Sequence, residues 1–291
     1  MELADGGDTT GETTGVVLCG LTLSFVQNTY SASLMAFAFL TERLILVGGF
    51  SDAAFNLRQP RLFVVDVESH KGARIEFNQV EYVCAFLYPA CHSWVRALSF
   101  LIRSDPSTGW TPDARLGVPF SIGPGPRLYV VTIWVMHEEG ITPIDLFVLS
   151  STLLEHIGTV GEGKSKHEFG WEEWGPTGTR MMTHAPHSHV WVCYVFGTRF
   201  SAIGREERGM LEVWDFNQLG MRRDMGREGV EYVEDESVVG MRPVFVEEVR
   251  TSLPYRVVRR AVPEVFTEAM CSEDSAILVD VSVGCLVNGR C

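Results

Sequence analysis

The feature that most constrains this sequence is a repeated unit: an apolar strand, a polar turn, and a second apolar strand ending in Asp or Ser. The apolar runs are rich in Val, Ile, Leu, Phe and Trp and are bounded by Gly, Pro, Asp or Ser, which is typical of β-strands. Four units fit the pattern: Arg43–Phe50 with Arg61–Val67, Arg127–Val135 with Asp145–Ser150, His189–Gly197 with Leu211–Phe216, and Val265–Cys271 with Ala276–Val281. The repetition predicts an all-β protein.

Several of these runs are apolar on both faces, which predicts sheets packed on both sides, as in the blades of a β-propeller. The units are spaced more widely than the roughly 40–45 residues of a compact four-stranded blade, so extra strands or insertions are expected. Two more apolar runs between Asn78 and Arg103 predict further strands, and the charged segment 220–236 predicts an insertion. No window of about twelve residues shows a capped helical stripe. The expected fold is a β-propeller-like array, complete or incomplete, of antiparallel four-stranded blades with loop insertions.

Two domain boundaries follow from composition. Residues 1–15 are small, polar and acidic, which predicts a disordered tail, and residues 16–291 are expected to form one β-propeller-like domain. Thr13–Thr41 carries no charge, but polar residues divide it into apolar pieces of about 11 and 7 residues, short of the roughly 20 that a membrane-spanning helix needs. Two strands around a polar turn are expected there.

Charge and cysteine usage limit the partners and the compartment. The net charge of −13 is opposite to the clustered positive charge that nucleic acid or an anionic membrane surface requires, so neither is expected as a partner. The seven cysteines are an odd number without paired short spacings, and no Asn-x-Ser/Thr site occurs. A reducing compartment, cytoplasmic or nuclear, is therefore expected.

Several longer phrases resemble a known family. These phrases are IRSDPSTGWTPDARLGVPFSI, DLFVLSSTLLEHI, WEEWGPTGTRMM, VWVCYVFGTRFSAI, VWDFNQL and LPYRVVRR. Together they resemble the C-terminal region of basidiomycete (fungal) F-box proteins, from about Ser33 to Ser282. The resemblance implies a propeller-like region that recruits a protein target for a ubiquitin ligase. It also implies an N-terminal F-box that docks on the Skp adaptor of a cullin complex. No LP-x-E-type helical motif is evident before the strands, so Skp adaptor and cullin are expected partners only if an F-box equivalent exists.

Gly158–Ser165 (GTVGEGKS) fits the P-loop pattern G-x-x-x-x-G-K-[ST], in which Gly158, Gly163, Lys164 and Ser165 would contact a nucleotide phosphate. The preceding STLLEHI fits a strand, as a P-loop requires. The following KHEFGWEEWGP contains two glycines and a proline and makes a poor helix, which favours a glycine-rich loop between blades. A nucleotide-binding enzyme using segment 158–165 is the alternative to a binding module.

Three histidines, His184, His187 and His189, lie within six residues just before a predicted strand. Imidazoles at this density could bind zinc, but no fourth ligand can be named and Pro186 favours a turn. A solvated turn is the preferred interpretation. The pair Cys91–His92 is adjacent in sequence only and does not indicate a nucleophilic dyad.

Two further sets of residues are candidates for partner binding. Trp171 and Trp174 flank two glutamates, and on the expected strand Glu172 and Glu173 would point to opposite faces and could not flank one scissile bond. Arg256, Arg259 and Arg260, with Arg222 and Arg223, could form a cluster that reads acidic or phosphorylated peptides. Ordinary solvated strand arginines explain these positions as well. The sequence predicts a non-enzymatic protein-interaction module without a cofactor or metal, which binds a protein or peptide target.

Overall fold

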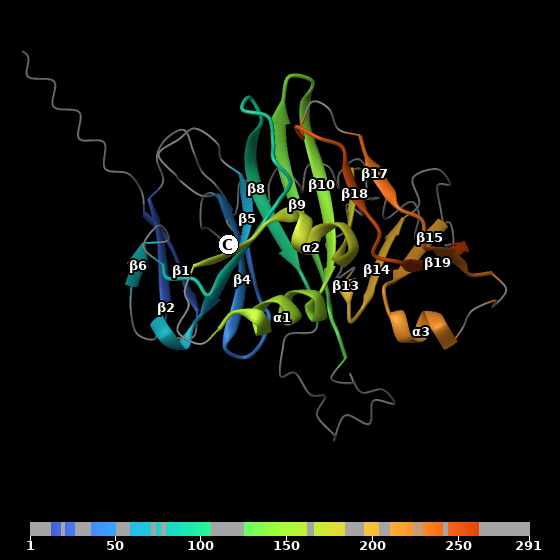
Figure 1. The fold of residues 1–291 in the computed structure, drawn as a ribbon, viewed down its shortest axis with the longest axis horizontal. Helices are drawn as coiled ribbons and strands as arrows, with labels where there is room; N and C mark the ends of the chain where they lie inside the picture. The colour runs from blue at the N-terminus through green and yellow to red at the C-terminus, as the bar shows by residue number, and fades with distance from the viewer. Residues whose placement is uncertain are drawn as a thin grey trace, which may run out of the picture.

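Three antiparallel sheets lie side by side along the long axis of the protein in a computed structural model (Figure 1). The structure describes residues 13–18, 21–26, 36–50, 59–70, 74–76, 80–105, 125–161, 166–183, 195–203, 210–223, 226, 229–240 and 244–261. All-β architecture is confirmed by these ranges, which show three sheets in succession and no closed ring of blades. The fourth predicted unit, at Val265–Val281, and the first twelve residues lie outside the described ranges.

Sheet I has the strand order β11-β7-β5-β4-β3. Its strands are β3 (Ala36–Phe39), β4 (Leu44–Phe50), β5 (Pro60–Asp66), β7 (Cys84–Leu87) and β11 (His167–Phe169). The first four form an antiparallel meander, and a short 3-10 helix, Glu68–His70, follows β5. Strand β11 pairs with β7 in parallel, and its Phe169 stacks on Phe86 at 5.2 Å. The first predicted unit is confirmed as the hairpin of β4 and β5.

Sheet II has the order β12-β10-β9-β8, and all its strands are antiparallel. Its strands are β8 (Arg96–Arg103), β9 (Leu128–His137), β10 (Gly140–Leu149) and β12 (Thr179–Met182). The second predicted unit corresponds to β9 and β10, which pair along their whole length. The two runs predicted between Asn78 and Arg103 are also confirmed as strands, β7 and β8.

Sheet III has the order β13-β14-β15-β19-β16. Its strands are β13 (Val195–Phe196), β14 (Arg199–Ile203), β15 (Met210–Asp215), β16 (Glu231–Val233) and β19 (Tyr255–Ala261). In the third predicted unit, β14 lies between the two predicted strands and pairs with both. Strand β16 falls within the predicted insertion 220–236, so part of that segment belongs to the sheet.

Two small sheets complete the described strands. One contains β1 (Thr13–Leu18), β2 (Leu21–Val26) and β6 (Arg74–Glu76), and the other contains β17 (Ser237–Val239) and β18 (Val249–Thr251). Strands β1 and β2 form the hairpin that the uncharged N-terminal stretch predicts. The predicted disordered tail is wrong for its last three residues, 13–15, which belong to β1 because they pair with β2.

The sheets are held together by apolar cores between their faces. Leu62 and Val64 of sheet I pack in one core with Val131 and Leu146 of sheet II. On the opposite face of sheet II, Phe147 packs in a second core with the Phe200 face of sheet III. A third core covers the other face of sheet I. Burial on both faces, expected from the continuous apolar runs, is therefore confirmed for sheets I and II.

Each hairpin ends in an equivalent backbone contact. The N–H of the residue after the second strand donates to the carbonyl before the first strand: Val67 to Arg43, Ser150 to Arg127, and Phe216 to Thr198. In sheets I and III the preceding residue is an aspartate, Asp66 or Asp215, whereas in sheet II it is Leu149. The strand pairing therefore aligns Leu149, rather than Ser150, with the two aspartates.

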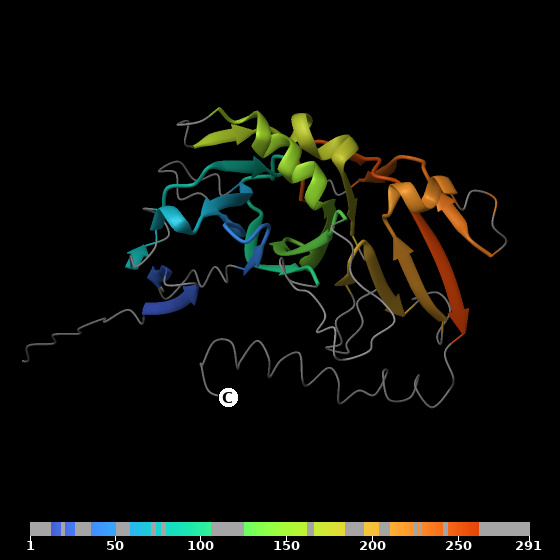
Figure 2. The same ribbon diagram turned by 90° about the horizontal axis from the view of Figure 1, so that it is seen from below.

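The expectation of no helices is wrong. The structure contains α1 (Ser150–Thr159), α2 (Trp171–Gly178) and α3 (Gln218–Arg223), and α1 and α2 run along one side of the sheets (Figure 2). Segment STLLEHI lies in α1 rather than in a strand, because Leu153 and Ile157, four residues apart, both pack on the first core. These helices are shorter than the twelve-residue window of the sequence argument. No helix among the described residues is long and apolar enough to span a membrane.

Candidate functional site

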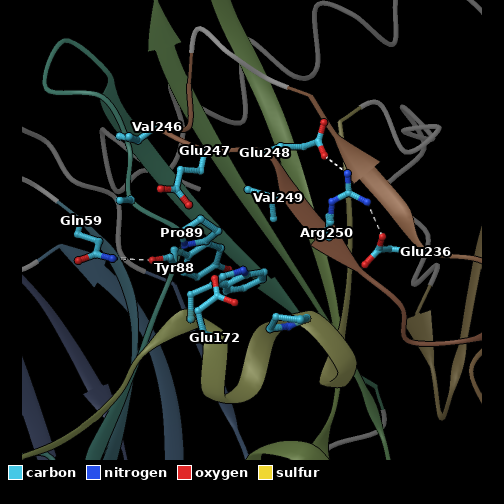
Figure 3. Close-up of a pocket in the computed structure, with 13 residues that line it drawn as sticks. Gln59, Tyr88, Pro89, Glu172, Glu236, Val246, Glu247, Glu248, Val249 and Arg250 are labelled. Atoms are coloured by element: carbon cyan, nitrogen blue, oxygen red, sulfur yellow. Dashed lines mark hydrogen bonds and ion pairs between the residues drawn. The ribbon is translucent and has the colours of Figure 1, made fainter.

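A cavity of about 610 Å³ lies between α2, the segment that follows β7, and the segment that leads into β18 (Figure 3). This volume is within the range of small-ligand and side-chain pockets, roughly 300–1,000 Å³. Its walls consist of Gln59, Tyr88, Pro89, Ala90, Trp171, Glu172, Pro176, Glu236, Val246, Glu247, Glu248, Val249 and Arg250. We call it the α2 pocket.

Helix α2 forms one wall because its two tryptophans anchor it. Trp174 is 1% exposed, donates its indole N–H to the Leu87 carbonyl at 3.1 Å, and meets Phe86 edge to face at 5.1 Å. The Trp171 ring folds back over the helix, where a Cβ on Gly175 would come within 2.4 Å of it. Glycine at 175 is therefore needed for the Trp171 ring to lie there. The Glu173 carboxylate accepts from the Gly170 N–H at 2.8 Å and satisfies the start of the helix.

The opposite wall is fixed by main-chain hydrogen bonds rather than by side chains. The Val246 N–H donates to the Ala90 carbonyl and the His92 N–H donates to the Val244 carbonyl, both at 2.9 Å. The Ser252 N–H donates to the Pro176 carbonyl of α2 at 2.7 Å. These bonds join three segments that are far apart in the sequence, so the pocket exists only in the folded protein.

Aromatic rings form the inner part of the pocket. Tyr88 is 1% exposed and stacks on Trp171 at a centroid distance of 6.4 Å. Its hydroxyl has no hydrogen-bond partner among the described residues. Burial, and secondarily the charge of Asp145, raises the pKa of Tyr88 well above its ordinary value. The phenol is therefore neutral at physiological pH.

Carboxylates dominate the outer part of the pocket, with four glutamates against one arginine. Arg250 donates to Glu236 at 2.8 Å and also to Glu248 (Figure 3). Hydrogen bonds from these two carboxylates raise the pKa of Arg250, which stays charged. No ion pair to a described residue involves the other two glutamates, Glu172 and Glu247. The pocket therefore carries uncompensated negative charge.

The structure separates the predicted tryptophan pair. Both lie on α2 rather than on a strand, and the three-residue spacing places them on one helix face, with ring centroids 5.3 Å apart. Trp174 is a core residue, whereas Trp171 lines the pocket. Glu172 and Glu173 also differ, because Glu172 lines the pocket and Glu173 caps the helix.

The predicted arginine cluster is not assembled. Arg256 donates to the buried Asp215 at 2.8 Å, on the face of β19 opposite to Arg259. Arg259 forms ion pairs with Glu212 and Glu231, and Arg260 donates to the Arg259 carbonyl. Arg256 and Arg259 are therefore committed to carboxylates of their own sheet. Arg222 and Arg223 lie apart from them in sequence, in the last turn of α3.

The P-loop candidate has a different local setting from a phosphate-binding loop. Gly158 lies inside α1, so a helix rather than a strand leads into the segment, and strand β11 follows at His167. Gly163, Lys164 and Ser165 lie outside the described residues, as do His184, His187 and His189. Within the described part of the chain, no group of three or more His, Cys, Asp or Glu residues could hold a metal ion.

Cys91 lies close to the pocket but is not in a reactive form. Burial raises the pKa of the Cys91 thiol to about 12, and its Sγ lies 3.8 Å from the Pro89 carbonyl oxygen. The thiolate is the nucleophilic form, so a neutral thiol at physiological pH is consistent with the absence of a Cys91–His92 dyad in the sequence argument.

Sequence reasoning missed Glu236, Glu247, Glu248 and Arg250. Their residue types follow no motif, and no spacing links them to α2. Glu247 and Glu248 interrupt an apolar run, which is the one local signal of an exposed segment.

Comparisons with known proteins identify no relative. No protein-family model matches the chain, and neither the curated proteins nor the solved structures contain a match.

Proposed function

We propose that this chain is a non-enzymatic protein-interaction module that binds a segment of another protein in the α2 pocket. The observation that carries the proposal is the pocket itself. It is a recessed surface with an aromatic interior and charged walls, and main-chain bonds hold it in shape. Pockets of this kind bind by enclosing an anchor side chain and fixing its orientation with a few polar groups.

The composition of the walls favours binding over catalysis. The described residues that line the pocket include no serine, cysteine, histidine or lysine, the usual nucleophiles and proton-transfer groups. The buried phenol of Tyr88 is held neutral by its raised pKa. What remains is a combination of rings, carboxylates and one guanidinium, which suits recognition.

We further propose that the three sheets are successive blades of a propeller-like array, of the type that recruits targets in the F-box proteins whose phrases this sequence resembles. Each sheet is built on an antiparallel meander, and the hairpins of all three end in the same backbone contact. Strand β11 departs from a four-stranded blade by adding a parallel strand to sheet I.

Affinity capture of the tagged chain from cells that express it tests this function. Val246 lines the pocket and is 53% exposed, and Val238 on β17 is 46% exposed and does not line it. We expect Val246→Ser to reduce recovery of the bound protein about fivefold, since an apolar contact of about 1 kcal/mol is lost. Val238→Ser should leave recovery unchanged. Equal recovery with both variants would show that partners bind elsewhere.

The same capture separates a ligase receptor from a module without a ligase. Recovery of Skp adaptor and cullin together would support the ligase-receptor role. Recovery of neither, with another partner that depends on Val246, would support a binding module that acts outside such a complex.

A further inference from the structure

The two glutamates without an ion-pair partner lie at different sides of the pocket. Figure 3 shows Glu172, from α2, and Glu247, from the segment before β18, on either side of Tyr88 and Pro89. They come from separate walls, so a positive group between them could contact both. Acidic walls of this kind attract a cation and disfavour an anionic or neutral group.

A metal ion does not fit this arrangement. A divalent cation needs several oxygen ligands that converge on one point. Among the described residues, however, no three acidic or histidine side chains approach closely enough to hold one. The carboxylates are instead spread along the walls, which suits an extended cation with several donors.

The pocket already holds one guanidinium in this way. Arg250 bridges Glu236 and Glu248, so carboxylates on this side of the pocket are spaced to accept a planar fork of N–H donors. Elsewhere in the chain guanidiniums also lie over aromatic rings, with Arg180 5.3 Å from the Tyr255 centroid and Arg127 5.7 Å from that of Tyr129. The α2 pocket offers both kinds of partner, carboxylates and aromatic rings, to an incoming side chain.

We propose that the α2 pocket binds an arginine side chain of the partner protein, with Glu172 and Glu247 accepting from the guanidinium beside the rings of Trp171 and Tyr88. This inference rests on the proposed function and specifies what the partner presents. Arginine is favoured over lysine because its planar head can donate to two carboxylates at once and can stack on a ring.

NMR titration with a blocked Gly-Arg-Gly peptide tests the inference, with the Trp171 indole N–H resonance as the readout. We expect this resonance to shift with a dissociation constant of about 1 mM or below. The matched Gly-citrulline-Gly peptide, which has nearly the same shape without the charge, should bind at least about tenfold more weakly. Equal shifts with the two peptides would overturn the inference.

Single-charge variants locate the site. Glu172→Gln and Glu247→Gln should each weaken binding of the arginine peptide about fivefold to tenfold. Glu138→Gln removes the same charge from the exposed turn between β9 and β10 and should have no effect. If all three variants bind like the wild type, the guanidinium does not lie between Glu172 and Glu247.

The inference and the proposed function can fail separately. Capture that depends on Val246, combined with no preference for arginine over citrulline, would retain the module and remove the arginine. Capture that ignores Val246, whatever the peptide does, would remove the proposed function of the pocket.

Discussion

Sheets II and III differ in how their two faces are used. Sheet II is buried on both faces, with Leu146 in one core and Phe147 in the other. Sheet III contributes one face to the core that it shares with sheet II. On its other face Val213 and Val258 are half-buried and Phe196 is 50% exposed. The difference shows that the stack is stabilised from its centre, and that identical residue types contribute very unequally to stability.

A matched pair of substitutions gives the largest expected difference between the two sheets. Phe147 is fully buried and stacks on Phe216 at 5.3 Å, so Phe147→Ala should lower the free energy of unfolding by about 4 kcal/mol. Phe196→Ala removes the same atoms from a half-exposed edge strand and should change it by less than about 0.5 kcal/mol. Urea denaturation of both variants measures the difference. Similar losses would mean that the outer face of sheet III is covered as closely as sheet II.

The buried aspartate of sheet III is expected to have the next largest effect. Burial acts to raise the pKa of Asp215, but hydrogen bonds from Arg256, Thr198 and the Asn217 N–H outweigh it and hold this pKa below its ordinary value. Asp215→Asn leaves Arg256, whose side chain is 13% exposed, without its carboxylate. We expect a loss of about 3 kcal/mol at pH 7.

The pH dependence of this loss follows from the direction of the pKa shift. Because the folded-state pKa of Asp215 is depressed, its contribution is fully present above the unfolded-state pKa near 3.9 and is lost as pH falls through the folded value. Urea denaturation between pH 7 and pH 2 should therefore show the wild type and Asp215→Asn converging below about pH 4. Asp66→Asn is the control, since its partner Arg43 is 59% exposed and a smaller loss is expected. A constant difference across this range would contradict the assignment.

The smallest expected effect comes from the exposed ion pairs of sheet III. Arg259 pairs with Glu212 and Glu231, but its side chain is 45% exposed, so water screens both pairs. Arg259→Gln should lower the free energy of unfolding by less than about 1 kcal/mol, and less still in high salt. Thermal or urea unfolding at two salt concentrations is sufficient. A loss as large as that of Asp215→Asn would show that exposure does not rank these pairs.

The strands could be predicted from sequence because burial on both faces leaves a local record. The apolar runs of β4, β5, β9 and β10 are continuous, and their turns are marked by polar residues. Helix α2 could not be predicted in the same way, since Gly170, Gly175 and Pro176 argue against a helix. Its stability depends on Trp174 reaching Leu87 and on Glu173 reaching Gly170.

The pocket was less predictable than the strands. Trp171 was identified as a candidate, but Glu247 and Arg250 face it only because main-chain bonds join Val246 to Ala90 and Ser252 to Pro176. No periodicity within one segment encodes a contact between segments that are 80 or more residues apart in the numbering. Predicting it would require the tertiary pairing in advance.

The parallel pairing of β11 with β7 has a consequence for synthesis of the protein. His167 pairs with Cys84, so the edge of sheet I cannot be completed until the chain has passed through β8, β9, β10 and α1. At about 5–20 residues per second, a ribosome leaves that edge open for several seconds, exposed to other nascent chains. Sheets I and II therefore mature together, because the segment that closes the first sheet is translated only after most of the second.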